Sequence, residues 1–263
     1  MLAITTRNRA LNKQRADLLI VEQGLAETRN RAQALILAGS IVVVTTSATA
    51  ATQERRVDKA GEMLPADALL RLKGEPLLYV SRGGVKLAKA LDHFAVEPRD
   101  RTCLDIGAST GGFTDCLLQR GALKVYAVDV GYNQLAWQIR ENPKVAVIER
   151  ENIRTLDPAL IPEPVSLVVI DVSFISLALV IPHAVKFMIP GAELVALVKP
   201  QFEVGKGEVG KGGIVRDPQA RTRAVQNVGL MIEQTGFTAS RTIDSPILGA
   251  KGNHEFLLHA RFG

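Results

Sequence analysis

Apolar and polar residues follow two different patterns along the chain, and the pattern changes near residue 79. From residue 104 onward, short apolar runs such as TCLDIG, KVYAVDV, VSLVVID and AELVALVKP alternate with segments of helical length, and HEFLLHARF is the last such run. Continuous apolar runs separated by helices are typical of a mostly parallel sheet with helices on both faces. We therefore expect an α/β domain over residues 79–263.

The pattern before residue 79 is shorter and more polar. It predicts a short helix that is closed by Gly24, and a second helix that is capped by Thr28 and ended by Gly39. The β-branched run SIVVV follows as a strand, and the turn-rich stretch after it contains Pro65 and Pro76. The expected organisation is a basic tail at 1–14, a small domain at 15–64, a linker at 65–78 and the α/β domain at 79–263.

Composition narrows the classes of protein. Apolar residues make up 47% of the chain, and 32 basic against 27 acidic residues give a net charge of +5, which mildly favours an anionic partner. Cys103 and Cys116 are the only cysteines, and neither they nor the four histidines have metal-ligand spacing. No apolar run approaches the roughly 18 residues of a spanning helix. These features predict a cytoplasmic protein without a metal site.

Three arginines mark the starts of the two expected N-terminal helices: Arg15, Arg29 and Arg31. A cation gains nothing from the helix dipole at that end. One interpretation is that the three side chains bind phosphate. The alternative is that they are solvated charges on a small helical hairpin.

The stretch LDIGASTGGFTD, residues 104–115, places a glycine-rich turn between a strand and a helix. Its pattern, with Gly107, Gly111 and Gly112, differs from the G-x-G-x-x-G of dinucleotide sites. Asp129 ends the next strand, where a carboxylate can accept hydrogen bonds from both ribose hydroxyls of a nucleoside. Together these features indicate a nucleoside with a cationic amino-acid tail, which describes S-adenosylmethionine. The alternative is that the glycines serve only strand–helix packing.

Four charged residues are expected at the same edge of the sheet. Asp171 and Lys199 each follow an apolar strand, and Glu255 lies at the same edge if the last strand is antiparallel. Lys86 belongs to a helix that precedes the first strand. Desolvation favours a neutral lysine and nearby carboxylates favour a charged one. The set suits removal of a proton from a weak acid such as a hydroxyl, although it also fits a structural ion-pair network.

Five stretches of the chain resemble the TlyA family of haemolysin-A-like rRNA methyltransferases. They are YVSRGGVKL, LDIGASTGGFTD, AVDVGYNQLAW, DVSFISL and LVKPQFEVGKGEVGKGGIVRDP. The resemblance covers nearly the whole chain. It implies a Rossmann-like methyltransferase sheet of the FtsJ type, mostly parallel with the last strand antiparallel. It also implies that a small α+β RNA-binding domain of the S-four type precedes this sheet.

The resemblance also implies an activity, which is methylation of a cytidine ribose 2′-hydroxyl in rRNA of the ribosomal subunits. The family's catalytic tetrad falls on Lys86, Asp171, Lys199 and Glu255. Of these four, we expect Lys199 to remove the proton, because the apolar run that it ends favours its neutral form. The expected cofactor contacts are Gly107, Ala108, Ser109, Thr110, Gly111, Gly112, Asp129, Val130, Asn152 and Asp171. The expected RNA contacts are Arg15, Arg29, Arg31, Arg82, Lys206 and Lys211. No metal, membrane or obligate protein partner is expected.

Two features predict different ribosomal subunits. The chain ends shortly after Glu255, as in short family members that act on the large subunit alone, whereas the extension before Arg15 is similar to the longer members. Alternative functions are a non-catalytic RNA-binding or ribosome-assembly protein, a methyltransferase of a small molecule or protein, and a cytolysin. The intact tetrad and Asp129 weigh against the first, the basic N-terminal domain against the second, and the lack of a spanning or strongly amphipathic segment against the third.

Overall fold

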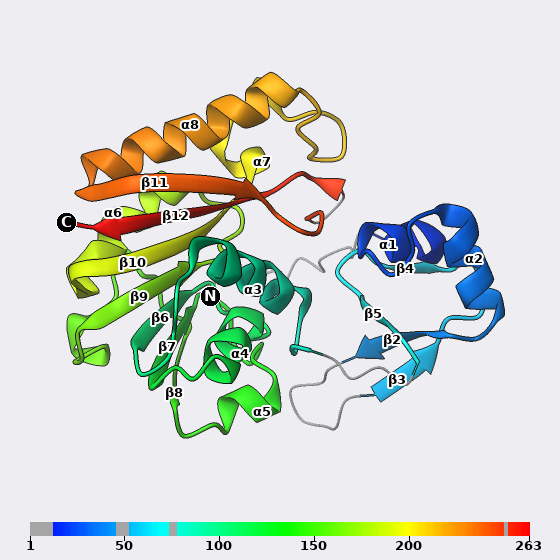
Figure 1. Ribbon diagram of the computed structural model, residues 1–263, viewed down its shortest axis with the longest axis horizontal. Helices are drawn as coiled ribbons and strands as arrows, with labels where there is room; N and C mark the ends of the chain where they lie inside the picture. The colour runs from blue at the N-terminus through cyan, green and yellow to red at the C-terminus, as the bar shows by residue number, and fades with distance from the viewer. Residues whose placement is uncertain (1–12, 46–52, 74–77, 250–251) are drawn as a thin grey trace, which may run out of the picture. The chain divides into compact units, whose positions relative to one another are not determined.

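The computed structural model describes residues 13–45, 53–73, 78–249 and 252–263 (Figure 1). The described residues divide into two compact units, and the change from the first to the second lies between residues 73 and 78. Of the tail expected at 1–14, residues 1–12 lie outside the described residues. The span 65–78, expected to be a linker, includes a strand of the first unit, because residues 69–72 pair with the strand that begins at Ile41.

The first unit is a small α+β fold. Its elements are β1 (Lys13–Arg15), α1 (Ala16–Glu22), α2 (Arg29–Leu37), β2 (Ile41–Thr45), β3 (Gln53–Arg56), β4 (Met63–Pro65) and β5 (Leu69–Leu72). As predicted, Thr28 caps α2, because its Oγ1 accepts the backbone N–H of Arg31 at 3.2 Å. Gly39, at φ +68°, ends the same helix. Leu19 of α1 and Ile36 of α2 are buried in a small apolar core.

A buried carboxylate joins the two helices of this unit. Asp17 accepts hydrogen bonds from Arg15 at 2.9 and 3.0 Å, from Arg29 at 2.8 Å and from Gln33 at 3.0 Å. Its side chain is fully buried, whereas both guanidinium groups are about half exposed. The hydrogen bond from Arg15 is the main reason that the pKa of Asp17 lies far below its usual range. Two of the three arginines expected to bind phosphate therefore also hold the fold together.

The second unit contains the large sheet. Its elements are α3 (Arg82–Phe94), β6 (Thr102–Ile106), α4 (Gly112–Gln119), β7 (Lys124–Asp129), α5 (Trp137–Arg140), β8 (Val145–Glu149), η1 (Pro158–Leu160), β9 (Val165–Ile170), η2 (Leu177–Leu179), α6 (Ile181–Ala184), η3 (Val185–Phe187), β10 (Met188–Val198), α7 (Pro200–Glu203), η4 (Lys206–Glu208), α8 (Pro218–Gln234), β11 (Phe237–Asp244) and β12 (Phe256–Phe262). Within the described residues the strand order is β11-β12-β10-β9-β6-β7-β8. Strand β12 is antiparallel to both of its neighbours, whereas β10, β9, β6, β7 and β8 are parallel to one another. The expected fold class is confirmed.

Helices cover both faces of this sheet (Figure 1). Along β9 the alternation is direct: Leu167 and Val169 pack with residues of α3 and α4, whereas Val168 and Ile170 pack with residues of α6 and α8. The strands are therefore apolar on both faces, which is why they appear in the sequence as continuous apolar runs.

The sequence does not predict β11. Of its residues only Phe237 is buried, and its register with β12 shifts between Thr238 and Arg241. The strand lies at the edge of the sheet and carries no alternating or continuous apolar pattern. Its pairing with β12, rather than its own composition, makes it a strand.

The buried carboxylate of the first unit gives a stability prediction. We expect Asp17→Asn to lower the unfolding free energy of this unit by about 1–3 kcal/mol at pH 7, because charged hydrogen bonds are lost. Since the pKa of Asp17 is lowered by folding, its contribution is present above the unfolded pKa of about 3.9 and declines as the pH falls below it. The difference in unfolding free energy between wild type and Asp17→Asn should therefore narrow as the pH falls from 5 to 2. Amide hydrogen exchange in α1 and α2 measures it.

The control is Asp58→Asn, because Asp58 forms an exposed pair with Arg56 at 3.4 Å. This change should have little effect on exchange in α1 and α2 at any pH. A gap between wild type and Asp17→Asn that stays constant over the acid range would contradict the assignment.

Candidate functional site

The ends of four chain segments meet at one edge of the sheet. Because β6, β9 and β10 are parallel, their carboxyl ends open on the same side, and Asp171 and Lys199 directly follow β9 and β10. Strand β12 is antiparallel, and Phe256 pairs with Val198. Glu255 therefore lies at the same edge as Lys199, as the sequence predicts.

The glycine turn after β6 is held against its neighbours by its backbone. The N–H groups of Gly107 and Ala108 donate to the Val128 carbonyl at 2.8 and 3.2 Å. Gly107 has a φ of +87°, and a Cβ at this position would lie 2.5 Å from the carbonyl oxygen of Asp171. Only glycine therefore allows this turn to approach the end of β9 so closely.

A second glycine contact brings α3 onto α4. A Cβ on Gly112 would lie 2.1 Å from Ser81 Oγ and 3.0 Å from the backbone nitrogen of Gly84. The missing side chain lets the N-terminal turn of α3 lie against that of α4. Lys86, one turn further along α3, is consequently placed beside the glycine turn.

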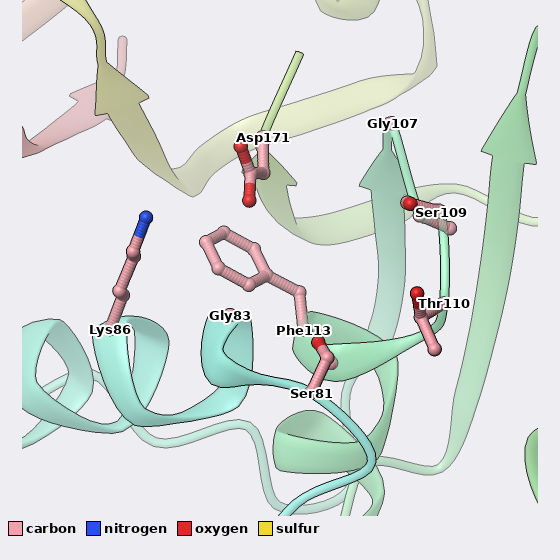
Figure 2. A pocket seen from close by; sticks show the side chains of 10 residues that line it. Ser81, Gly83, Lys86, Gly107, Ser109, Thr110, Phe113 and Asp171 are labelled. Carbon is pink, nitrogen blue, oxygen red and sulfur yellow. The ribbon is translucent and has the colours of Figure 1, made fainter. Parts of the chain in front are cut away.

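A pocket opens between the glycine turn, α3 and the end of β9. Figure 2 shows Lys86 and Asp171 pointing toward the same space, with the ring of Phe113 beneath them. The pocket is lined by Ser81, Gly83, Lys86, Gly107, Ala108, Ser109, Thr110, Gly112, Phe113 and Asp171.

A buried carboxylate precedes the glycine turn by two residues. Asp105 is completely buried, and burial raises its pKa to about 7, with smaller contributions from the charges of Asp171 and Asp129. Thr114 donates to one of its oxygens at 2.6 Å, and the other has no hydrogen-bond partner among the described residues. The carboxylate of Asp171, which is in the lining, suits a ligand with positive charge. S-adenosylmethionine, with its sulfonium and ammonium groups, fits these residues.

Two buried ion pairs stand at the edge of the site. Lys199 Nζ lies 2.5 Å from Asp171 Oδ1 and donates to Ser173 Oγ at 2.9 Å. Lys86 Nζ lies 2.5 Å from Glu255 Oε2. Burial pushes the pKa of Asp171 upward, but the charges of Lys199 and Lys86 outweigh it, so the pKa stays below its usual value. Asp171 is therefore ionised, and it faces both lysines.

The other expected cofactor residues occupy different positions. Asp129 accepts the backbone N–H of Ser109 at 2.8 Å and that of Gly131 at 2.6 Å, so its carboxylate holds the rim of the turn rather than lining the pocket. Val130 is 71% exposed. Asn152 Oδ1 accepts the backbone N–H of Arg154 at 3.1 Å. Gly111 forms the N-cap of α4.

The residues expected to bind RNA differ in whether their side chains are held by other parts of the protein. Arg15 and Arg29 are paired with Asp17, whereas Arg31 is exposed and forms no ion pair within the described part of the chain. Arg82 donates to the Leu248 carbonyl at 2.7 Å. Lys211 is exposed, and the side chain of Lys206 is not among those that the structure describes.

Several residues at the site were not predicted. Ser81, Gly83 and Phe113 line the pocket, and Ser173 binds Lys199.

Phe174 is 76% exposed, has a φ of +68° and packs against Phe202 at a ring distance of 5.2 Å. An exposed aromatic ring on left-handed backbone, three residues after a charged strand end, is a costly conformation for a bulky side chain. The motif DVSFISL contains both Ser173 and Phe174, but spacing alone did not single them out.

No group of three or more His, Cys, Asp or Glu side chains among the described residues is arranged to hold a metal ion. None of the helices that they form combines the length and apolar character needed to cross a membrane.

Comparison with known proteins places the chain among methyltransferases. The model of the FtsJ-like methyltransferase family matches residues 79–262. The protein YqxC of Bacillus subtilis (strain 168) is 48% identical over 248 residues, which cover 94% of this chain and 85% of YqxC. The 16S/23S rRNA (cytidine-2′-O)-methyltransferase TlyA of Mycobacterium tuberculosis (strain CDC 1551 / Oshkosh) is 45% identical over 255 residues, 95% of this chain and 90% of TlyA. A solved Streptococcus thermophilus protein described as a hemolysin is 44% identical and superposes with a TM-score of 0.76, covering 96% of this chain and 90% of that one.

The close approach at Gly107 gives a testable prediction. We expect Gly107→Ala to weaken S-adenosylmethionine binding at least about tenfold, or 1.4 kcal/mol, because the methyl group would push the turn away from Asp171. Gly191→Ala is the matched control, since Gly191 has a similar φ of +78° but nothing within 4 Å of its Cβ position. Both changes should strain the backbone by about 1–3 kcal/mol, and only the first should affect binding. Calorimetry measures both; equal affinities in the two variants would show that the close approach does not shape the site.

Proposed function

Because the chain belongs to the family of FtsJ-like methyltransferases, we propose that it transfers a methyl group from S-adenosylmethionine to the 2′-hydroxyl of a cytidine ribose in ribosomal RNA. The observation that carries this proposal is the pair of lysine–carboxylate contacts, both largely removed from water, beside the pocket. A ribose hydroxyl is a very weak acid, and two lysines at one edge are suited to orient it and to take its proton.

The chain offers a cradle for the cofactor. The backbone of residues 107–110 lines the pocket and would follow the amino-acid part of the cofactor, while Asp171 supplies negative charge next to it. Asp129, at the rim, keeps lone pairs that can accept hydrogen bonds from the ribose hydroxyls of the cofactor. When bound, the cofactor supplies an electrophilic methyl group.

Lys199 is the proton acceptor in this proposal. In its neutral form its Nζ would take the proton of the 2′-hydroxyl while the methyl carbon passes from the sulfonium sulfur to the oxygen, which leaves a neutral thioether, and Asp171 would stabilise the resulting ammonium. Lys86 donates a hydrogen bond that orients the hydroxyl, and Glu255 fixes Lys86. The remaining contribution is placement of the oxygen in line with the methyl group.

Phe174 offers a surface for the base that carries the target ribose. Its ring is largely exposed and lies three residues beyond Asp171. RNA-modifying sites commonly stack an unpaired base on an aromatic side chain. A base on this ring would stack on the residue that follows Ser173, the hydrogen-bond partner of Lys199.

The first unit supplies contacts to the RNA outside the target nucleotide. Arg31 is exposed, and Arg15 and Arg29 present the outer faces of guanidinium groups whose other faces Asp17 holds. Fixed guanidinium groups lose little freedom when they bind phosphate. In this proposal the RNA is recognised within a ribosomal subunit.

The deciding experiment is a single-turnover assay with labelled S-adenosylmethionine and unmodified ribosomal subunits, followed by mapping of the methyl group. We expect wild-type protein to label a cytidine 2′-oxygen. Lys199→Met and Lys86→Met, which keep the apolar stem, should each slow transfer at least about 100-fold, with little change in cofactor affinity. Lys124→Met is the control, because Lys124 forms a partly exposed pair with Glu163 away from the pocket. A wild-type rate in either tetrad variant would remove that lysine from the mechanism.

The arginines give a prediction about salt dependence. We expect Arg31→Ala to weaken subunit binding and to reduce the slope of log affinity against log salt by about 0.7–0.9 for the lost phosphate contact. Arg31→Lys should keep most of the slope because the charge is retained. Arg15→Ala and Arg29→Ala should also reduce the slope, with some loss of stability because Asp17 loses a partner. If Arg31→Ala keeps the wild-type slope, Arg31 does not contact phosphate.

A further inference from the structure

One carboxylate near the site has no part in the tetrad. Glu203 ends the single-turn helix α7, which begins directly after Lys199. Its Oε2 accepts the hydroxyl hydrogen of Ser176 at 2.6 Å, and its Oε1 accepts the backbone N–H of Leu177 at 2.9 Å. Among the described residues no lysine, arginine or histidine forms an ion pair with it. A partly buried carboxylate that relies only on neutral donors is costly to keep, and burial accordingly raises its pKa.

These hydrogen bonds join the two segments that carry the catalytic pair. The segment after β9 runs from Asp171 through Ser173 to Leu177, and the segment after β10 runs from Lys199 to Glu203. They are connected at one end by Lys199, which contacts Asp171 and Ser173, and at the other end by Glu203. A loop fixed at both ends leaves little freedom for the residues between the two points.

The residue between these two connections is strained. Phe174 has left-handed backbone at φ +68°, and its ring packs on Phe202, the neighbour of Glu203. A bulky residue keeps such a conformation only when its surroundings impose it. The hydrogen bonds of Glu203, together with the Phe174–Phe202 contact, supply that constraint.

We propose that Glu203 is a positioning residue for methyl transfer, which fixes loop 173–177 so that the Ser173 hydroxyl holds Lys199 Nζ and the Phe174 ring stays packed on Phe202. The inference rests on the proposed function for its catalytic consequence. Glu203 itself does not line the pocket. Its effect is therefore on the rate of transfer and not on cofactor binding.

The test compares single-turnover transfer at saturating RNA and cofactor. Glu203→Ala should slow transfer about 10- to 100-fold, with cofactor affinity within about twofold of wild type. Glu203→Gln keeps one carbonyl acceptor for Leu177 and should recover much of the rate. Ser176→Ala should slow transfer less than Glu203→Ala, and the double variant should be no slower than Glu203→Ala alone, because both changes break the same contact.

The control for general destabilisation is Glu193→Ala. Glu193 is a buried carboxylate on β10, the strand that precedes α7, and it is hydrogen-bonded to His259 at 3.0 Å and to Arg101 at 2.6 Å. Its loss should lower stability without slowing transfer. The proposal is overturned if Glu203→Ala transfers at the wild-type rate, or if Glu193→Ala slows transfer as much.

Amide hydrogen exchange tests the same contact without any substrate. Exchange in residues 173–179 should rise in Glu203→Ala and stay at the wild-type level in Glu193→Ala. If wild-type protein methylates no rRNA, the proposed function fails, and the exchange result still decides whether Glu203 fixes the loop. If wild-type protein methylates rRNA and neither exchange nor rate responds to Glu203→Ala, the positioning role is wrong and the proposed function stands.

Discussion

The contact between Lys199 and Asp171 is the constraint on which the candidate site of the second unit depends. Two charges that are largely removed from water cost free energy unless their geometry is good and their remaining hydrogen-bonding groups are satisfied. Here the distance of 2.5 Å is reached because β9 and β10 are parallel neighbours, with Ile170 at the end of β9 paired with Ala196 near the end of β10. The parallel pairing of two apolar strands thus places Asp171 and Lys199 close together, and their positions do not depend on the conformation of a long loop.

The same end of β9 also sets the position of the cofactor turn. The carbonyl of Asp171 lies where a Cβ of Gly107 would be, so the turn after β6 rests on the residue whose side chain holds Lys199. The pocket and the proposed proton acceptor therefore both depend on the backbone position of Asp171. This arrangement explains why Asp171 belongs both to the pocket lining and to an ion pair. It also means that a change at this strand end disturbs binding and chemistry together.

Much of this could be predicted from the sequence, because buried parallel strands leave a strong signal. Continuous apolar runs located the strands, and a charged residue at the end of each run located Asp171 and Lys199. Strand β11 left no such signal, since seven of its eight residues are not buried. Long-range contacts were also invisible: neither the pairing of β5 with β2 nor the burial of Asp17 between Arg15 and Arg29 follows from local pattern. Phe174 was missed because its conformation is imposed by residues outside its own segment.

The two ends of β10 show how the fold can tolerate a strained site. At one end Glu193 is hydrogen-bonded to His259 and Arg101, and the contact with His259 is the main reason that its pKa falls to about 2. Lys199 follows the other end of β10. Beside it, in the loop after β9, Phe174 has an exposed ring and left-handed backbone. Strain persists only where surrounding structure determines the conformation. The long register with β9 and β12 holds the strand in place, so that the end beside the pocket can keep an unfavourable geometry.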